Sequence, residues 1–259
     1  MDSRLRRVVL LGAVISAFFL LAACNSGESA TSTPTVTVVP SPQPSPSPLP
    51  SSPSPLPATP LPSPTAVETP VPSLSGFIFP IAGACLPSSD NLMPNAPRVY
   101  RAGVHEGIDF YDGYSCATIG LGTPVLAAKS GLVIRADVNH LPLTPEELAQ
   151  LLARSRAQGY TDAEALDRFR GRQVWIYHGY GVISRYAHLD SVAPEIIVGR
   201  YVTPGEVIGY VGNSGTPEEV SAPGEEMHLH FEIWVGDSYL GKGLPPDQVR
   251  ELAQRAFSP

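Results

Sequence analysis

A proline-rich segment from residue 31 to 73 limits how much of this chain can form a packed core. Proline alternates there with Ser, Thr, Leu and Val, Glu68 is the one charged residue, and more than half of the chain's 29 prolines lie in it. Such a sequence lacks the amide donors and apolar periodicity of a core, so we expect extended polyproline II at about 3.1 Å per residue. The segment predicts a stalk of up to roughly 130 Å, followed by about 185 residues that suffice for one domain.

The N-terminus indicates export from the cytoplasm. Three arginines precede an apolar run from Val8 to about Ala23, as in the charged and apolar regions of a secretory signal. Leu21-Ala-Ala-Cys24 resembles a bacterial lipobox. We therefore expect a lipoprotein signal peptide at 1–23 and a stalk at 24–74, held to the cell membrane or envelope by acyl chains on Cys24. A plain secretory signal with an incidental cysteine is the alternative.

Cys85 and Cys116 form an even pair once Cys24 is assigned to lipid. Disulfides persist outside the cytoplasm, so we expect the two cysteines to be bridged. The bridge would close a loop of about thirty residues and limit the unfolded state by about 3 to 4 kcal/mol. Two unpaired thiols are the alternative.

Residues 75–259 are predicted to form a mainly β domain. Runs of apolar and β-branched residues bounded by turn residues predict strands at 123–128, 131–136, 174–178, 182–189, 205–211 and 229–235. The first two strands are expected to meet near Lys129-Ser130. The third and fourth are expected to form a hairpin around Gly179-Tyr-Gly181.

Helix start and stop signals predict a helical hairpin at 144–171, inserted between the strands. Thr144-Pro-Glu-Glu147 supplies an N-cap and a capping-box glutamate, and Thr161-Asp-Ala-Glu164 repeats the signal. We expect the insert to be a surface decoration, with a wall of the substrate cleft or a docking site for a protein regulator as the alternative. A last helix starting near Pro246-Asp247 is expected to pack onto the domain.

Three short motifs carry the candidate chemistry. They are His105-Glu-Gly-Ile-Asp109, Tyr186-Ala-His188-Leu and His228-Leu-His230-Phe. Side chains alternate across a strand, so His228 and His230 should share one face with Glu232 and Trp234, opposite an apolar face. Imidazole and carboxylate groups hold Zn²⁺ tetrahedrally, and a catalytic site uses three protein ligands. Five candidates therefore leave two for proton transfer.

The order and context of these motifs resemble the lysostaphin-type, or LytM-like, zinc metallopeptidases that cut peptides in bacterial cell walls. The resemblance covers about residues 77 to 240, and the glycine-punctuated segments 122–128 and 202–215 share in it. It implies a lysostaphin-type, duplicated-hybrid-motif β-sheet domain that carries the helical insert and the C-terminal helix. It also implies His105, Asp109 and His230 as ligands of one Zn²⁺ per domain, with His188 and His228 as the catalytic pair.

The activity implied by the resemblance is a zinc-dependent endopeptidase that hydrolyses peptide bonds of peptidoglycan with a zinc-activated water. We expect His228 to act as the base and His188 to contact the oxyanion, although the sequence does not separate these roles. The net charge of −7 argues against nucleic acid or an anionic membrane surface as the main partner. A catalytically inactive peptidoglycan-binding or regulatory module of the same fold and a zinc-carrying binding lipoprotein are the alternative functions.

Three further features receive lesser roles. We expect His178 to make a structural hydrogen bond and His140 to have no chemical role. Residues 216–226 are longer and more acidic than the family pattern requires, and are expected to reshape the rim of the cleft.

Overall fold

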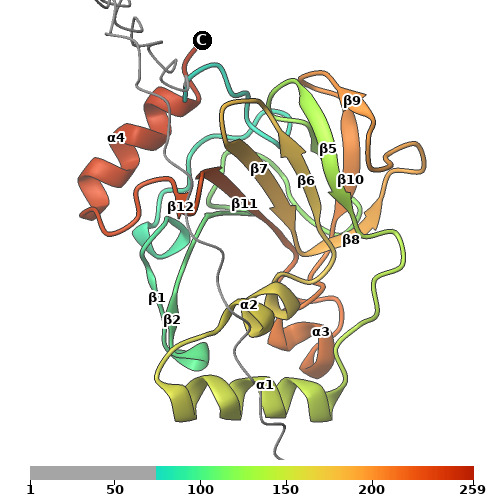
Figure 1. The fold of residues 1–259 in the computed structure, drawn as a ribbon, viewed down its shortest axis with the longest axis vertical. Coiled ribbons are helices and arrows are strands. Elements are labelled where there is room, and N and C mark those ends of the chain that lie inside the picture. Colours follow the sequence, from blue (N-terminus) through green and yellow to red (C-terminus); the bar gives the residue numbers. More distant parts are fainter. Residues whose placement is uncertain (1–73) are drawn as a thin grey trace, which may run out of the picture. The chain divides into compact units, whose positions relative to one another are not determined.

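The structure, a computed structural model, describes residues 74–259. The predicted signal peptide, Cys24 and the stalk up to residue 73 lie outside the described residues. The described part contains three antiparallel sheets and few helices, so the prediction of a mainly β domain is confirmed (Figure 1). In residues 74–259 there is no helix long and apolar enough to cross a bilayer.

The largest sheet has seven strands and is organised around its long strand β11. Its path runs β12-β11-β7-β6-β5-β9, and β3 also pairs with β11. All these pairings are antiparallel. The strands are β3 (Ile108–Tyr111), β5 (Gly131–Ala136), β6 (Val174–Tyr177), β7 (Val182–Ala187), β9 (Tyr201–Val202), β11 (His228–Val235) and β12 (Ser238–Tyr239). The predicted hairpin is confirmed as β6 and β7.

Two smaller sheets complete the β structure. One has the order β4-β10-β8 and the other pairs β1 with β2. The strands are β1 (Pro97–Arg98), β2 (Gly103–Val104), β4 (Pro124–Leu126), β8 (Leu189–Val192) and β10 (Val207–Val211), and short 3-10 helices are η1 (Asp90–Leu92) and η2 (Val99–Arg101).

The expectation that strands 123–128 and 131–136 meet near Lys129-Ser130 is wrong. The first forms β4, which pairs with β10, and the second forms β5, which pairs with β6 and β9 in the other sheet. Ala127 and Ala128 between them are fully buried, and their backbone groups bond to Glu206 and Ile78. Residues 127–130 therefore carry the chain between sheets instead of turning it back.

The core lies against one face of β11. Leu229, Phe231 and Ile233 are buried in the main apolar cluster, as their alternation predicts. The C-terminal helix α4 (Pro246–Ala256) adds Val249 and Ala253, both fully buried, to the same cluster. The predicted packing of this helix onto the domain is confirmed.

The helical insert forms as predicted, except that the N-cap of its second helix is one residue later than predicted. Helix α1 (Pro145–Gln158) begins at Thr144, whose hydroxyl accepts from the Glu147 amide at 3.1 Å. Helix α2 (Ala163–Arg170) is capped by Asp162 and not by Thr161, because the Asp162 carboxylate accepts from the Ala165 amide at 2.9 Å. Both helices end at a glycine with positive φ.

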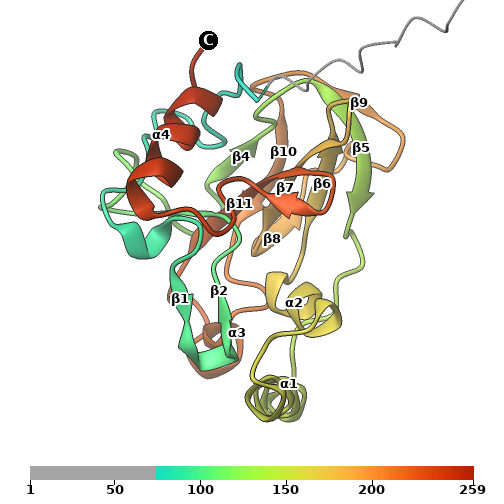
Figure 2. The same cartoon turned by 60° about the vertical axis from the view of Figure 1, so that its left-hand side comes forward.

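A short helix, α3 (Pro217–Ser221), was not predicted. It follows Thr216-Pro-Glu-Glu219, the same four letters that begin α1, and Thr216 caps it in the same way. Helices α1, α2 and α3 gather at one end of the domain, and α4 lies at the other end (Figures 1 and 2).

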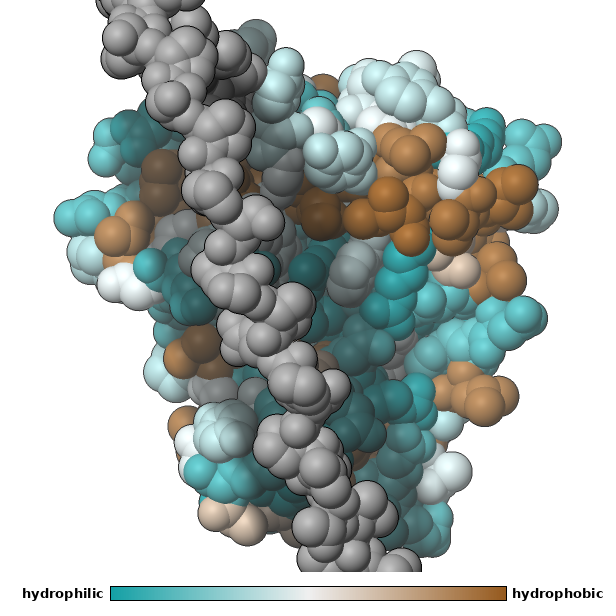
Figure 3. All heavy atoms as spheres, in the orientation of Figure 1, coloured by the Kyte–Doolittle hydropathy of each residue, from teal (hydrophilic) through white to brown (hydrophobic). Residues whose placement is uncertain are grey.

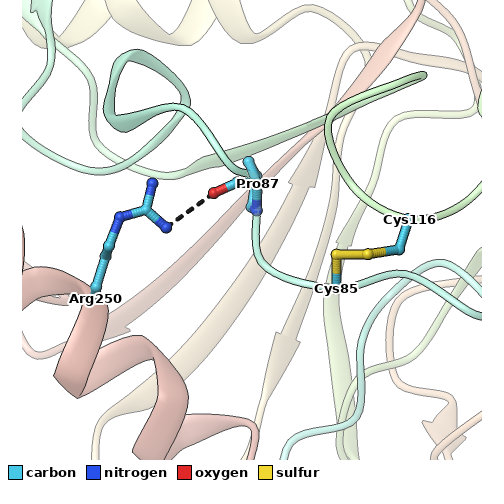
Figure 4. Close-up of a disulfide and its surroundings, with 4 residues drawn as sticks. All are labelled: Cys85, Pro87, Cys116 and Arg250. Carbon is cyan, nitrogen blue, oxygen red and sulfur yellow. Dashed lines mark hydrogen bonds between the residues drawn. A yellow bond between two sulfur atoms is a disulfide. The ribbon is translucent and has the colours of Figure 1, made fainter.

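Cys85 and Cys116 form a disulfide across a sequence separation of 31 residues, with their Cα atoms 5.5 Å apart. Figure 4 shows the bridge beside a second restraint on the same segment, in which Arg250 of α4 donates to the Pro87 carbonyl at 2.8 Å. Arg250 also pairs with Asp90 at 2.6 Å. Residues 85–90, ahead of the first histidine motif, are thus tied both to Cys116 and to α4.

Exposed apolar side chains gather near β5, β9 and the loop before β9 (Figure 3). Leu132 of β5 faces Tyr201 of β9 in the strand register, and both are exposed. Ile134, Ile197 and Val198 are exposed in the same part of the chain. None of these side chains lines the groove described below.

Candidate metal centre

Strand register brings two of the three proposed ligands together. Asp109 in β3 is the direct cross-strand partner of His230 in β11, and on the other edge of β11 the partner of His230 is Ala187, the residue before His188. His105 lies just ahead of β3, and its amide donates to the Ala96 carbonyl at 2.8 Å. Residues 121 or more positions apart thus converge because antiparallel pairing fixes their positions.

The three side chains meet in a tight triangle of possible ligand atoms. His105 Nε2 lies 3.0 Å from His230 Nδ1 and 2.9 Å from Asp109 Oδ1, and His230 Nδ1 lies 2.8 Å from the same oxygen. All three residues are buried. The other oxygen of Asp109 accepts from Arg98 Nη2 at 2.8 Å, so the two oxygens of this carboxylate have different partners.

The hydrogen bonds at the far side of each ring make these three atoms acceptors. His105 Nδ1 faces the Met93 carbonyl at 3.0 Å, and His230 Nε2 faces the Glu232 carboxylate at 2.7 Å. Both partners only accept, so in neutral rings these nitrogens carry the protons. His105 Nε2, His230 Nδ1 and Asp109 Oδ1 then present three lone pairs to one another. A cation bound between them would accept these three lone pairs and remove their mutual repulsion.

The residues fit a zinc ion. Zinc takes nitrogen and oxygen ligands at about 2.0–2.1 Å in a tetrahedron, which separates its ligand atoms by about 3.3 Å. The observed separations of 2.8 to 3.0 Å are a few tenths of an ångström shorter. This cluster could therefore hold a metal ion.

The pKa values of the three cluster residues are set by burial and by the neighbouring charges. Burial would raise the pKa of Asp109, but the neighbouring His105, His230 and His228 hold it well below its usual range. Burial would lower the pKa of His230, but its contacts with Asp109 and Glu232 outweigh burial and raise it to about 9. Burial lowers the pKa of His105. Burial and the neighbouring charges thus act in opposite directions on the pKa values of Asp109 and His230.

His188 and His228, the predicted catalytic pair, lie beside the triangle. Their ring centroids are 4.7 Å apart, and His228 Nε2 lies 3.8 Å from Asp109 Oδ1. His188 Nδ1 donates to the Ser214 carbonyl at 2.8 Å, and His228 Nδ1 donates to the Glu226 carbonyl at 2.7 Å. Burial lowers the pKa of both imidazoles. Each neutral ring therefore keeps Nε2 as an acceptor.

His188 adopts an unusual backbone conformation. Its φ is +59°, in the left-handed region that non-glycine residues rarely occupy. The residue stands between β7 of the large sheet and β8 of the three-stranded sheet, so this conformation makes the corner where the chain changes sheets. Such strained residues persist where the surrounding structure holds them, often at functional sites.

Gly107 in the first motif allows β3 and β11 to approach. A Cβ at this position would lie 2.5 Å from the Phe231 carbonyl oxygen and 2.9 Å from His230 Cε1. Glycine is therefore needed between His105 and Asp109 for steric reasons.

The cluster opens into a groove of about 780 Å³. The helical insert supplies the apolar side chains Leu152, Leu166 and Phe169 to its lining, and α3 with its flanks supplies Thr216, Pro217, Glu218 and Glu226. The favoured interpretation of the insert as surface decoration is wrong, because α1 and α2 form a wall of this groove. Residues of the segment 216–226 thus line the groove, and the expectation that they reshape its rim relative to the family pattern stays a prediction.

Sequence reasoning missed the support behind His230. Alternation predicts Glu232 on the histidine face but gives it no partner, and in the structure Arg170 of α2 donates to Glu232 at 2.7 Å. Arg98 was also missed. These partners are 62 and 11 residues apart from their carboxylates, and no local spacing signals such pairs.

The two remaining histidines lie outside the cluster. His178 Nδ1 lies 2.7 Å from the Ser130 carbonyl and its Nε2 lies 2.8 Å from the Ser184 hydroxyl, so the predicted structural role is confirmed. His140 lies 3.9 Å from Glu219.

Comparisons with known proteins find relatives among bacterial peptidases. The chain is 32% identical to an L-Ala--D-Glu endopeptidase of Bacillus subtilis over 84 residues, covering 32% of this chain and 26% of that protein. It is 27% identical to lysostaphin of Staphylococcus staphylolyticus over 140 residues, covering 54% of this chain and 20% of that protein. The chain thus spans about a quarter or less of the length of these relatives.

Among solved structures, the catalytic domain of lysostaphin from Staphylococcus simulans matches with 23% identity and a TM-score of 0.36, covering 60% of this chain and 85% of that one. A zinc-containing peptidase from Vibrio cholerae matches with 20% identity and a TM-score of 0.39, covering 63% of this chain and 38% of that one. The family model for peptidase family M23 matches residues 103–242, which include all five clustered side chains. The chain belongs to peptidase family M23.

Proposed function

We propose that this protein is a zinc-dependent endopeptidase that hydrolyses peptide bonds in bacterial peptidoglycan. The observation that carries the proposal is the triangle of His105 Nε2, Asp109 Oδ1 and His230 Nδ1, with two further imidazoles beside it and a groove in front. Family M23 consists of peptidoglycan-hydrolysing metallo-endopeptidases, and one relative is by name a peptidase of an L-Ala-D-Glu bond. We assign one zinc ion per domain to the three residues of the triangle.

At this site zinc would polarise the scissile carbonyl and lower the pKa of water toward about 7. His105 and His230 serve as ligands in the tautomers that Met93 and Glu232 impose on them. Arg98 occupies the second oxygen of Asp109, which favours binding through one oxygen.

His188 and His228 handle the protons. Both rings keep Nε2 as an acceptor, so either can take the proton of the attacking water, and the protonated ring can then donate it to the leaving amine. We assign His228 as the base, because its Nε2 lies 3.8 Å from the ligand oxygen of Asp109. We assign His188 to the developing oxyanion.

The cellular setting is part of the proposal. Residues 1–23 act as a lipoprotein signal, the lipid on Cys24 anchors the protein on the outer side of a membrane, and the proline-rich stalk at 24–74 carries the catalytic domain at 75–259 toward the wall. Digestion of the purified protein for lipid analysis of its N-terminal residue tests the anchor separately from the activity.

The activity is tested on purified peptidoglycan. We expect soluble fragments with new free amino groups and no new reducing sugar ends, because peptide bonds and not glycosidic bonds are cut. A chelator should stop the release and added zinc should restore it, and His228→Ala protein is the matched control.

Two results would contradict the proposal. Release of reducing ends would indicate glycoside hydrolysis. Binding to peptidoglycan without release of any fragment, with zinc present, would support the inactive binding or regulatory module instead.

A further inference from the structure

Glu232 lies at the centre of a buried charge network behind His230. Its side chain is fully buried, and one oxygen, Oε1, accepts from His230 Nε2 and from Arg170 Nε, both at 2.7 Å. The other oxygen accepts from Trp234 Nε1 at 2.5 Å and lies 3.6 Å from Arg185 Nη1. A buried carboxylate is tolerated only when it is paired and hydrogen-bonded, and these four contacts fix the direction of the Glu232 side chain.

Arg170 and His230 bind the same oxygen of Glu232. It is the last residue of α2, its side chain is buried, and its Nε donates to the same Oε1 that faces the imidazole. Arg185 contacts the opposite oxygen at a longer distance and lies between the rings of Trp175 and Trp234, 4.0 and 4.1 Å from their centroids. Arg185 is thus held by the tryptophans and cannot replace Arg170 without leaving them.

The end of α2 also contacts the backbone of His188. The Arg170 carbonyl accepts from the His188 amide at 2.9 Å. The next residue, Gly171, packs so closely on Ser214 that a Cβ would lie 2.1 Å from the Ser214 carbonyl oxygen, the atom that accepts from His188 Nδ1. One turn of the insert therefore contacts the supports of both His230 and His188.

We propose that Arg170 is a positioning residue that acts through Glu232 on His230, and that the α1–α2 insert is for this reason part of the metal centre's support. Arg170 holds Glu232 Oε1 against His230 Nε2, so the imidazole keeps the orientation in which Nδ1 faces Asp109 and His105. The inference rests on the proposed role of His230 as a metal ligand.

The test compares metal binding in variants that separate charge from packing. Arg170→Met keeps most of the side-chain volume and removes the charge, whereas Arg170→Lys keeps the charge and loses the planar donor group. Glu232→Gln keeps an acceptor and removes the negative charge. Arg168→Met is the matched control, since Arg168 lies on the same helix but pairs with Glu147 at 2.6 Å.

The readouts are the zinc dissociation constant, measured by competition with a chromophoric chelator, and the visible absorption of the cobalt-substituted protein. We expect Arg170→Met and Glu232→Gln to weaken zinc binding about 10- to 100-fold, the usual effect of losing a partner behind a ligand histidine. Arg170→Lys should recover most of that loss, and Arg168→Met should bind as the unmodified protein does. Cobalt absorption should change in Arg170→Met and not in the control.

Equal zinc affinity and cobalt absorption in the unmodified protein, Arg170→Met and Glu232→Gln would overturn the inference and leave the proposed function intact. Equal losses in Arg170→Met and Arg170→Lys would also overturn it, because they would indicate a packing role. No zinc binding by the unmodified protein would overturn both. Should Arg170→Met fail to fold, as judged by thermal unfolding without metal, Arg170→Lys and Glu232→Gln still decide the question.

Discussion

The two ring nitrogens of His230 face two differently built regions of the molecule. Nδ1 faces the strand side, which is β3, β7 and β11, and there Asp109 is placed by strand register. Nε2 faces Glu232, which is also on β11 but is held by Arg170 of the helical insert, and on this insert side the placement depends on side chains. Backbone register survives most side-chain substitutions, whereas an ion pair does not. Mutation of a residue on the strand side should therefore leave the fold intact and abolish metal binding or hydrolysis. Mutation on the insert side should change the orientation of the His230 ring.

Removal of a ligand on the strand side should have the largest effect. We expect His230→Ala and His105→Ala to lose stoichiometric zinc and all hydrolysis, because two remaining ligands do not hold the ion well. The strand pairing of β3 and β11 is made by the backbone, so the fold should persist. Metal analysis after dialysis, with circular dichroism on the same samples, measures both. A zinc content equal to that of the unmodified protein would remove the mutated residue from the ligand set.

Mutation of the catalytic pair should leave zinc binding intact and reduce hydrolysis. His188→Ala and His228→Ala should keep zinc and lose about 10² to 10⁴ in the rate of peptide release, the usual contribution of a general acid or base. Rates on purified peptidoglycan with matched zinc content are the measurement. Activity within a few-fold of the unmodified protein would assign that histidine a structural role.

Two glycines test the two sides by steric means. Gly107→Ala would place a Cβ 2.5 Å from the Phe231 carbonyl oxygen. Gly171→Ala would place a Cβ 2.1 Å from the Ser214 carbonyl oxygen, and the backbone of Gly171 has φ +64° and ψ −137°. We expect each to lower the free energy of unfolding by about 1–3 kcal/mol, measured by urea denaturation. Gly159→Ala at the end of α1 has φ +77° and no atom within 4 Å, so it should cost only about 1 kcal/mol. Equal losses in all three would show that close approach contributes nothing.

The smallest effect should come from the ion pair that joins the insert to β5. Burial would raise the pKa of Asp167, but hydrogen bonds from Arg135 and Gln173 outweigh it and the pKa is lowered. A lowered carboxyl pKa stabilises the fold above the unfolded value of about 3.9 and this stabilisation is lost as the pH falls below it. Asp167→Asn should thus cost about 0.5–1 kcal/mol at pH 7, since the pair is partly exposed. The difference from the unmodified protein should shrink by pH 3, and a difference that grew there would contradict the assignment.

The sequence predicted what depends on local pattern. Alternation in 228–235 gave the shared face of His228 and His230, and Thr144-Pro-Glu-Glu147 gave the start of α1. The same four letters at 216–219 also begin α3, a helix that is absent from the predicted elements. The prediction that the strands at 123–128 and 131–136 meet was wrong. The chain changes sheets at two buried alanines whose hydrogen-bond partners are far along the chain, and nothing in the local sequence indicates this change. The Arg170–Glu232 pair, 62 residues apart, has no local signal at all.

The contacts of residues 75–77 have a mechanical consequence. Ser75 accepts from Lys129 at 2.5 Å, and the amides of Gly76 and Phe77 donate to Ser258 and Ala256 at the end of α4. If the preceding stalk tethers the domain, tension enters at this point, at the end of the domain opposite α1 (Figure 1). The load is then carried first by backbone hydrogen bonds to α4 and by the buried Phe77 ring. A stretched tether would therefore strain the α4 end before it disturbed the groove.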